Sequence, residues 1–125
     1  MGDPKRRRKS PAFVMLYHKW MSTAAWAALS GIEVKLLVEM LRLYRGDNNG
    51  HLGLGQYQAA ATLGVARNTA ARAFEGLEEK GFIRPTRKGC FDVKGQQTEW
   101  RVTMWPAFGK VATHDYLKWS AEEKA

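Results

Sequence analysis

The sequence predicts a mainly helical α+β domain in which two neighbouring helices precede a β-hairpin. Three observations support this class: apolar residues recur at helical spacing, a glycine separates two helical segments, and the period changes to alternation near residue 82. A length of 125 residues suits one domain with one core. We expect a flexible basic arm over 1–11, the domain over 12–106, and a tail or short helix over 107–125.

The composition indicates a folded, basic protein. Hydrophobic residues make up 45% of the chain, which is too much apolar surface to leave in water. Lys and Arg number 20 against 12 Asp and Glu, so a net charge of +8 favours a polyanionic partner or an acidic ligand. Five of these cations form one block near the amino terminus: Lys5, Arg6, Arg7, Arg8 and Lys9.

Cys90 is the single cysteine, which excludes an internal disulfide and a cysteine-rich zinc site. A reducing cytoplasm is therefore the expected compartment. No apolar run approaches the roughly 20 residues that cross a bilayer, and the basic start lacks a signal-peptide pattern. We expect no membrane partner.

The amino-terminal part holds an ambiguous segment and one short helix. Residues 12–21 are apolar and aromatic, and their spacing fits a helix and a buried strand equally well. A short helix is expected over 24–29, with the hydroxyl of Ser22 or Thr23 as its cap.

The strongest predicted helix follows Ser30. Ser30 and Glu33 form a capping-box pattern, and an apolar stripe at helical spacing follows them. That stripe consists of Ile32, Leu36, Leu37, Met40, Leu41 and Tyr44. Gly46 is expected to end the helix in a left-handed cap within the turn-forming sequence GDNNG. Leu52 and Leu54 alternate with their neighbours and predict a short strand.

Two helices joined by a tight turn come next. We expect the first over 56–63 and the second from Arg67 to Lys80, with Gly81 as its stop. Gly64 supplies the left-handed turn, where a β-carbon would strain the backbone. The residues expected to face inward are Tyr57, Ala60 and Ala61 in the first helix, and Ala70, Ala73, Phe74 and Leu77 in the second.

A β-hairpin and a weak final element complete the chain. Alternating apolar and polar residues predict strands over 82–87 and 98–105, and Pro106 ends the hairpin. In the second strand, the inward residues are Trp100, Val102 and Met104, and the outward residues are Glu99, Arg101 and Thr103. The residues after Thr113 are expected to form a weak helix capped by Thr113, or to fray.

This element order is typical of the winged helix-turn-helix. The stretch from Phe13 to Pro106 resembles the winged-helix DNA-binding domains of plasmid replication initiators, phage replisome organisers and related bacterial regulators. The segments that carry the resemblance are AAWAALS (24–30), YRGDNNG (44–50), LGVARNTAARAFEGLEEKGFI (63–83) and TEWRVTMWP (98–106). One position departs from it, because Ala66 stands where such proteins usually have a Ser or Thr that caps the recognition helix. The loss of such a cap costs about 1 kcal/mol.

The resemblance implies that the first two turns of the helix 67–80 enter the major groove of duplex DNA. Arg67, Asn68 and Arg72 share its outward face, where arginine can pair with guanine and asparagine with adenine through two hydrogen bonds each. Thr69 is the expected phosphate contact. The second half of the helix is expected to stay clear of phosphates because it is acidic, with Glu75, Glu78 and Glu79.

Further cations are expected to contact the DNA backbone or the minor groove. The predicted wing contributes Arg84, Arg87, Lys88, Lys94 and Arg101. The basic block 5–9 is expected either to lie along a neighbouring minor groove or to serve as a solubilising tail. For the helix and wing cations, the alternative interpretation is a solvated surface.

No pattern indicates catalysis, a metal or another cofactor. The three histidines lack ligand spacing, and the chain has no nucleophile elbow and no phosphate-cradling loop. Cys90, close to Lys88, is either an inert thiol or a redox switch. Core positions are expected for Trp20, Trp26, Trp100 and Met40, whereas Trp105 and Trp119, if exposed, suit a dimer contact.

We therefore interpret the chain as a sequence-specific double-stranded DNA-binding protein. We expect a bacterial or mobile-element transcription regulator that acts on the nucleoid by occupancy. A homodimer is one expected arrangement. The resemblance also allows a replication-initiation role, although a chain of this length is expected to lack a helicase-recruiting domain. A winged helix that binds proteins is an alternative of another class.

Overall fold

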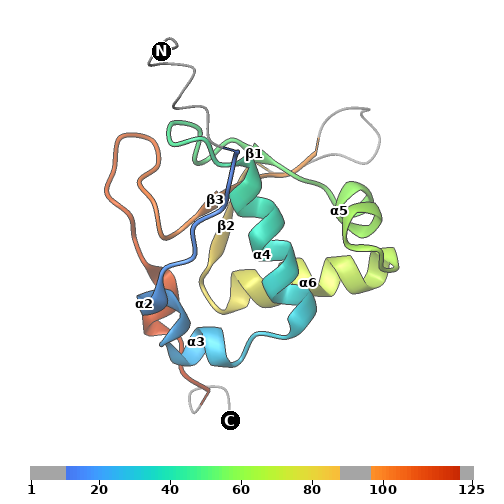
Figure 1. Ribbon diagram of the computed structural model, residues 1–125, viewed down its shortest axis with the longest axis horizontal. Helices are drawn as coiled ribbons and strands as arrows, with labels where there is room; N and C mark the ends of the chain where they lie inside the picture. Colours follow the sequence, from blue (N-terminus) through green and yellow to red (C-terminus); the bar gives the residue numbers. More distant parts are fainter. Residues whose placement is uncertain (1–10, 88–96, 122–125) are drawn as a thin grey trace, which may run out of the picture.

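The computed structural model describes residues 11–87 and 97–121, and within them it confirms a mainly helical α+β chain. Figure 1 shows helices packed against one small antiparallel sheet. The elements in chain order are α2 (His18–Met21), α3 (Ala24–Ala27), α4 (Gly31–Leu43), β1 (Leu52–Gly53), α5 (Gln56–Leu63), α6 (Arg67–Glu79), β2 (Ile83–Arg87), β3 (Glu99–Val102) and the 3-10 helix η1 (Asp115–Lys118).

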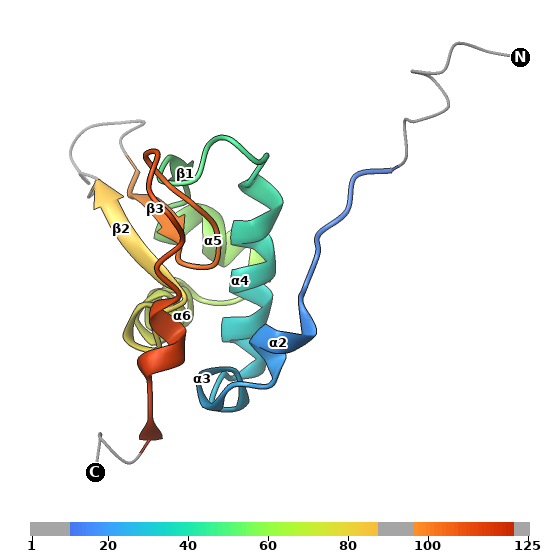
Figure 2. The ribbon, with the colours of Figure 1, turned by 90° about the vertical axis from the view of Figure 1, so that its left-hand side faces the viewer.

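The sheet has the order β1-β3-β2, so the second strand of the predicted hairpin lies in the middle. Leu52 pairs with Trp100 on one side of β3, and Ile83 pairs with Val102 on the other. The short strand predicted near residue 52 therefore closes one edge of the hairpin. Figure 2 shows the sheet on one side of the molecule and α4 on the other.

Helix α4 begins where the capping box predicts. The Glu33 amide donates to the Ser30 hydroxyl at 3.1 Å, and the Ser30 amide donates to the Glu33 carboxylate at 2.9 Å. The helix ends at Leu43, earlier than expected, and Gly46 takes its positive φ of 100° in the turn beyond. The predicted stripe is confirmed as the buried face, with Leu36, Leu37, Met40 and Leu41 buried and Ile32 and Tyr44 packed at its edge.

The helix pair is confirmed, with one error in orientation. Gly64 is left-handed, at φ 72° and ψ 35°, and it joins α5 to α6. Tyr57 and Ala61, predicted to face inward, are both exposed. The buried face of α5 is instead Ala59, Ala60 and Leu63. Small side chains there allow α5 to pack closely against α6, and this register turns Tyr57 outward.

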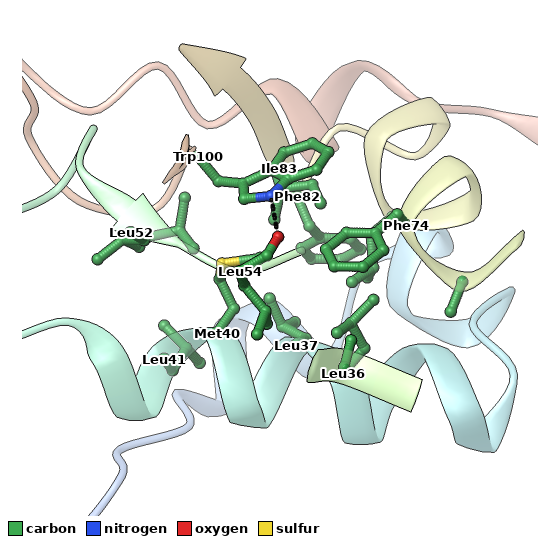
Figure 3. Close-up of a cluster of buried hydrophobic side chains, with 14 of the residues drawn as sticks. Leu36, Leu37, Met40, Leu41, Leu52, Leu54, Phe74, Phe82, Ile83 and Trp100 are labelled. Carbon is green, nitrogen blue, oxygen red and sulfur yellow. Dashed lines mark hydrogen bonds between the residues drawn. The ribbon is translucent and has the colours of Figure 1, made fainter. Parts of the chain in front are cut away.

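The core lies between α4, α6 and the sheet (Figure 3). Phe74 of α6 stacks on Trp100 of β3 with ring centroids 5.0 Å apart. The Trp100 indole N–H donates to the Leu54 carbonyl at 3.0 Å, which satisfies its one polar atom. Core positions are confirmed for Trp20, Trp100 and Met40, and Trp26 packs half-buried against Phe82.

The ambiguous segment 12–21 is neither one helix nor one strand. It has no regular secondary structure as far as Tyr17, and only His18–Met21 forms a helical turn. Thr23, and not Ser22, caps α3, because its hydroxyl accepts from the Trp26 amide at 3.2 Å. The segment before α2 is extended (Figure 2), and its Val14 and Leu16 are half-buried and pack against the core.

Strand β3 ends at Val102, earlier than the alternation predicts. Thr103, expected to face outward, is fully buried and donates its hydroxyl to the Gly81 carbonyl at 2.7 Å. After this point the chain turns, so alternation no longer assigns its faces. Asn49 is also buried and holds this turn, with bonds to the Val102 amide and carbonyl at 2.8 Å and to the Trp105 carbonyl at 2.9 Å.

The segment after Pro106 packs into the fold. Tyr116 is 2% exposed and stacks on Phe82 with ring centroids 5.1 Å apart. The short helix there has His114, and not Thr113, at its start. Gly81, with φ of 88°, lies so close to this segment that an added Cβ would be 2.7 Å from the Asp115 carbonyl carbon. This contact fixes the end of α6 against the carboxyl-terminal part of the chain.

Candidate nucleic-acid interface

The predicted recognition residues stand on the first two turns of α6. Arg67, Asn68 and Arg72 are exposed, and Thr69 is half-buried. Ala66 precedes them in an extended conformation, φ −68° and ψ 156°, and it provides no side-chain cap. Amide groups at the start of a helix lack intrahelical acceptors, so this end offers hydrogen-bond donors as well as side chains.

The charges along α6 oppose its own dipole. A helix is stabilised by acidic residues near its amino terminus and basic residues near its carboxyl terminus. In α6, Arg67 and Arg72 lie in the first half, and the second half carries Glu75, Glu78 and Glu79. Helix α4 follows the stabilising pattern, with Glu33 in its first turn and Arg42 in its last. The charges at the start of α6 therefore lower the stability of the helix and attract an anion.

The second half of α6 is anchored to α4. Gly76 lies so close to α4 that an added Cβ would be 1.7 Å from the Glu33 carboxylate. The Lys80 ammonium contacts both carboxylate oxygens of Glu33, at 3.3 and 3.4 Å, and both side chains are only 13% exposed. The second half of α6 is thus fixed against α4, while Arg67, Asn68 and Arg72 in the first half face solvent.

Tyr57 on α5 contacts the first of these cations. The Arg67 guanidinium carbon lies 4.6 Å from the centroid of the Tyr57 ring, and the guanidinium donates a hydrogen bond to the Tyr57 hydroxyl. Tyr57 is 66% exposed and neutral, so this contact does not cancel the positive charge. Ten residues separate the partners, and only the turn at Gly64 brings them together.

Acidic residues neutralise several cations elsewhere in the described ranges. Ion pairs join Arg42 to Glu39, Lys80 to Glu33, Arg84 to Asp115 and Arg87 to Glu99. Within residues 11–87 and 97–121, no ion pair engages Arg67 or Arg72. These two cations keep their charge available to a partner.

Two of the predicted wing cations are engaged by other residues of the protein. Arg84 and Arg101 stand directly opposite each other in the sheet, where like charges repel. Asp115 relieves this repulsion: Arg84 Nε donates to its carboxylate at 2.8 Å, and Arg84 also donates to the Glu78 carbonyl at 2.8 Å. Arg101 donates to the Thr113 hydroxyl at 3.0 Å. We call these contacts of Arg84 and Arg101 with Asp115 and Thr113 the clasp, because they hold the carboxyl-terminal segment against the sheet.

The electrostatics of Asp115 follow from this clasp. Burial raises the pKa of its carboxyl group, but hydrogen bonds from Thr113 and Arg84 and the charges of Arg84 and Arg101 outweigh burial. The net result is a pKa below the ordinary value of 3.8. Asp115 is therefore ionised at neutral pH, when it can neutralise the two arginines.

Arg87 is the third wing cation that the structure describes. Its side chain is 56% exposed and pairs with Glu99 at 3.4 Å, and Glu99 also contacts the His51 ring at 3.3 Å. Surface pairs of this kind exchange partners at little cost, so Arg87 can turn to a phosphate. The other predicted contacts lie outside the described residues: Lys5, Arg6, Arg7, Arg8, Lys9, Lys88 and Lys94, as does Cys90.

The two remaining tryptophans do not form an exposed pair. Trp105 is half-buried, stacks on Tyr44 with centroids 5.8 Å apart and meets Tyr17 and Trp20 edge-on. Trp119 is also half-buried and packs against the core. The described residues thus offer no exposed tryptophan surface for a dimer.

The part of the chain that the structure describes contains neither of two other features, a metal site and a membrane-spanning helix. No group of three His, Cys, Asp or Glu side chains there is placed to hold a metal ion. No helix in that part is long and apolar enough to span a bilayer.

Comparison with known proteins does not place the chain in a family. No family model, curated protein or solved structure matches it.

Proposed function

We propose that this protein is a winged helix-turn-helix that binds double-stranded DNA sequence-specifically and regulates transcription by occupying its site. Helix α6 is the recognition helix, and its first two turns enter the major groove. Arg67, Asn68 and Arg72 contact base edges, and Thr69 contacts a phosphate. The hairpin of β2 and β3 is the wing, and Arg87 at its edge contacts the backbone.

One observation carries this proposal: cations that form no ion pair among the described residues stand beside an exposed asparagine at an uncapped helix start. Arg67 reduces helix stability there, because it lies in the first turn, at the positive end of the dipole. A position that lowers stability without a gain in packing is typical of a binding site. DNA phosphates and guanine edges are the acceptors that arginines in this arrangement fit.

The clasp changes the expected contribution of the wing. Arg84 and Arg101 are engaged by Asp115 and Thr113, so they position the hairpin instead of contacting DNA. The wing then contacts DNA with the cations closer to its tip. Arg87 is the cation of this kind that the structure describes.

A titration of labelled duplex DNA at several salt concentrations tests the proposal. If about six phosphates are engaged, log affinity falls against log salt with a slope near −5. Arg72→Ala is expected to lower the slope by about one and to reduce discrimination between sequences. Arg42→Ala is the matched control, because it removes the same charge from α4 and leaves α6 intact.

A protein-interaction function is the second candidate. Phe13 is 75% exposed and Met15 is 50% exposed, and such apolar side chains suit a protein partner. This function predicts no salt-dependent binding to duplex DNA. It also predicts no effect of Arg72→Ala on partner capture, whereas Phe13→Ser and Met15→Ser abolish capture.

A further inference from the structure

An exposed tyrosine stands beside the proposed recognition surface without contributing to the core. Tyr57 is 66% exposed, although Ala59, Ala60 and Leu63 of the same helix are buried. Its ring lies instead against the Arg67 guanidinium, 4.6 Å from centroid to guanidinium carbon. The contact joins the start of α5 to the start of α6 across the turn at Gly64.

The chemistry of the contact restrains Arg67 without blocking it. A guanidinium carries five N–H donors in one plane, and one of them reaches the Tyr57 hydroxyl. The other donors remain available, and recognition of guanine needs two of them, directed at O6 and N7. The aromatic ring attracts the cation but carries no charge of its own, so Arg67 still attracts a phosphate or a base.

We propose that Tyr57 is a positioning residue for DNA recognition that holds the Arg67 guanidinium in the orientation from which it reads a base. The inference rests on the proposed DNA-binding function. An arginine side chain loses rotamer entropy when it is fixed. Because Tyr57 restricts Arg67 before DNA arrives, less of that entropy is lost on binding.

The size of the effect follows from the strength of the contact. Exposed cation–π contacts contribute about 0.5–1 kcal/mol, which corresponds to an affinity change of about two- to five-fold. Tyr57→Ala is expected to weaken binding by that factor. Tyr57→Phe keeps the ring and removes the hydroxyl, so the loss of affinity should be smaller than in Tyr57→Ala.

A double-mutant cycle on duplex DNA tests the inference. A duplex enriched by the full-length protein from a random library serves as the specific probe, and a scrambled duplex of equal length serves as the nonspecific probe. Affinities are measured for the wild type, Tyr57→Ala, Arg67→Ala and the double variant. Gln58→Ala is the matched control, because Gln58 is an exposed residue on the same helix. Circular dichroism checks that each variant is folded.

The inference predicts that Tyr57→Ala weakens specific binding in the wild type and changes nothing when Arg67 is already alanine. Binding to the scrambled duplex and the salt slope are expected to stay the same, because the tyrosine carries no charge. Additive losses would mean that Tyr57 contacts DNA directly, and an unchanged or tighter Tyr57→Ala would mean that it does not position Arg67. Either result overturns the inference alone. If the wild type binds neither duplex at low salt, the proposed function itself is wrong.

Discussion

The start of α6 lacks a cap, and restoring one provides a quantitative test of the structure. Ala66 already has the extended backbone that a capping residue adopts, and it is exposed. A serine at this position can accept a hydrogen bond from an amide of the first turn without moving a neighbour. Ala66→Ser is therefore expected to stabilise the protein.

The magnitude comes from measured caps in other helices. A serine cap contributes about 1 kcal/mol relative to alanine. Unfolding entropy is about 2.1 cal/mol/K per residue, so for 125 residues a gain of this size raises Tm by about 4 °C. Urea denaturation followed by far-UV circular dichroism measures the free energy of unfolding directly.

Two further variants separate the cap from other effects. Ser30→Ala removes the cap of α4 and is expected to cost about 1 kcal/mol. Ala66→Asp should stabilise the helix but weaken DNA binding, because its carboxylate repels phosphates. An Ala66→Ser protein that is no more stable than the wild type would show that the start of α6 does not have the described geometry.

Three other predictions concern contacts that hold the interface in place. Gly76→Ala is expected to destabilise the protein by at most about 1 kcal/mol in urea denaturation, because its Cβ displaces the Glu33 carboxylate from Lys80 while the loss of a helical glycine offsets part of that cost. A variant more stable than the wild type would show that the Glu33 carboxylate moves aside without a loss. Asn49→Ala is expected to cost about 1–3 kcal/mol or more by the same assay, since it leaves the buried Val102 amide without an acceptor. An Asn49→Ala variant as stable as the wild type would show that water accepts the hydrogen bond of the Val102 amide in place of the side chain. Asp115→Asn should lower stability at pH 7 and should remove part of its pH dependence: the folded pKa is depressed, so the contribution of Asp115 is present above about pH 4 and lost as the pH falls through the folded pKa. Parallel stability–pH curves for Asp115→Asn and the wild type would contradict the clasp.

Much of the fold follows from local signals. The capping box at Ser30 and Glu33 places the start of α4, and Gly64 places the turn between α5 and α6, because both signals depend on residues close in sequence. The alternation in β3 predicts the buried residues up to Val102. Local steric and hydrogen-bonding rules suffice for these elements.

The errors have tertiary causes. Tyr57 faces outward because α5 packs its smaller alanines inward. The spacing of apolar residues alone does not tell whether the tyrosine or an alanine is buried. Thr103 is buried because the chain leaves the sheet after β3. There the Val102 amide donates to the Asn49 side chain, and the Thr103 hydroxyl donates to the Gly81 carbonyl. Neither outcome depends on neighbours in sequence.

Part of the candidate site also follows from local signals, and part depends on tertiary contacts. Exposure of Arg67, Asn68 and Arg72 follows from helical periodicity and was predicted. The clasp on Arg84 and Arg101 depends on Asp115, which is 31 residues from Arg84 and gave no signal in the sequence. The pairing of Arg84 with Arg101, which calls for an acidic partner, becomes visible only with the strand register of the structure.

The most direct test is to map the surface that contacts DNA. Amide chemical shifts of the labelled protein are recorded by NMR with and without a duplex enriched from a random library. We predict that the largest changes fall at residues 66–72, with further changes near Arg87. Changes confined to the segment before α2 or to the Arg84–Asp115 clasp, or no changes at low salt, would contradict the assignment of α6 as the DNA-binding helix.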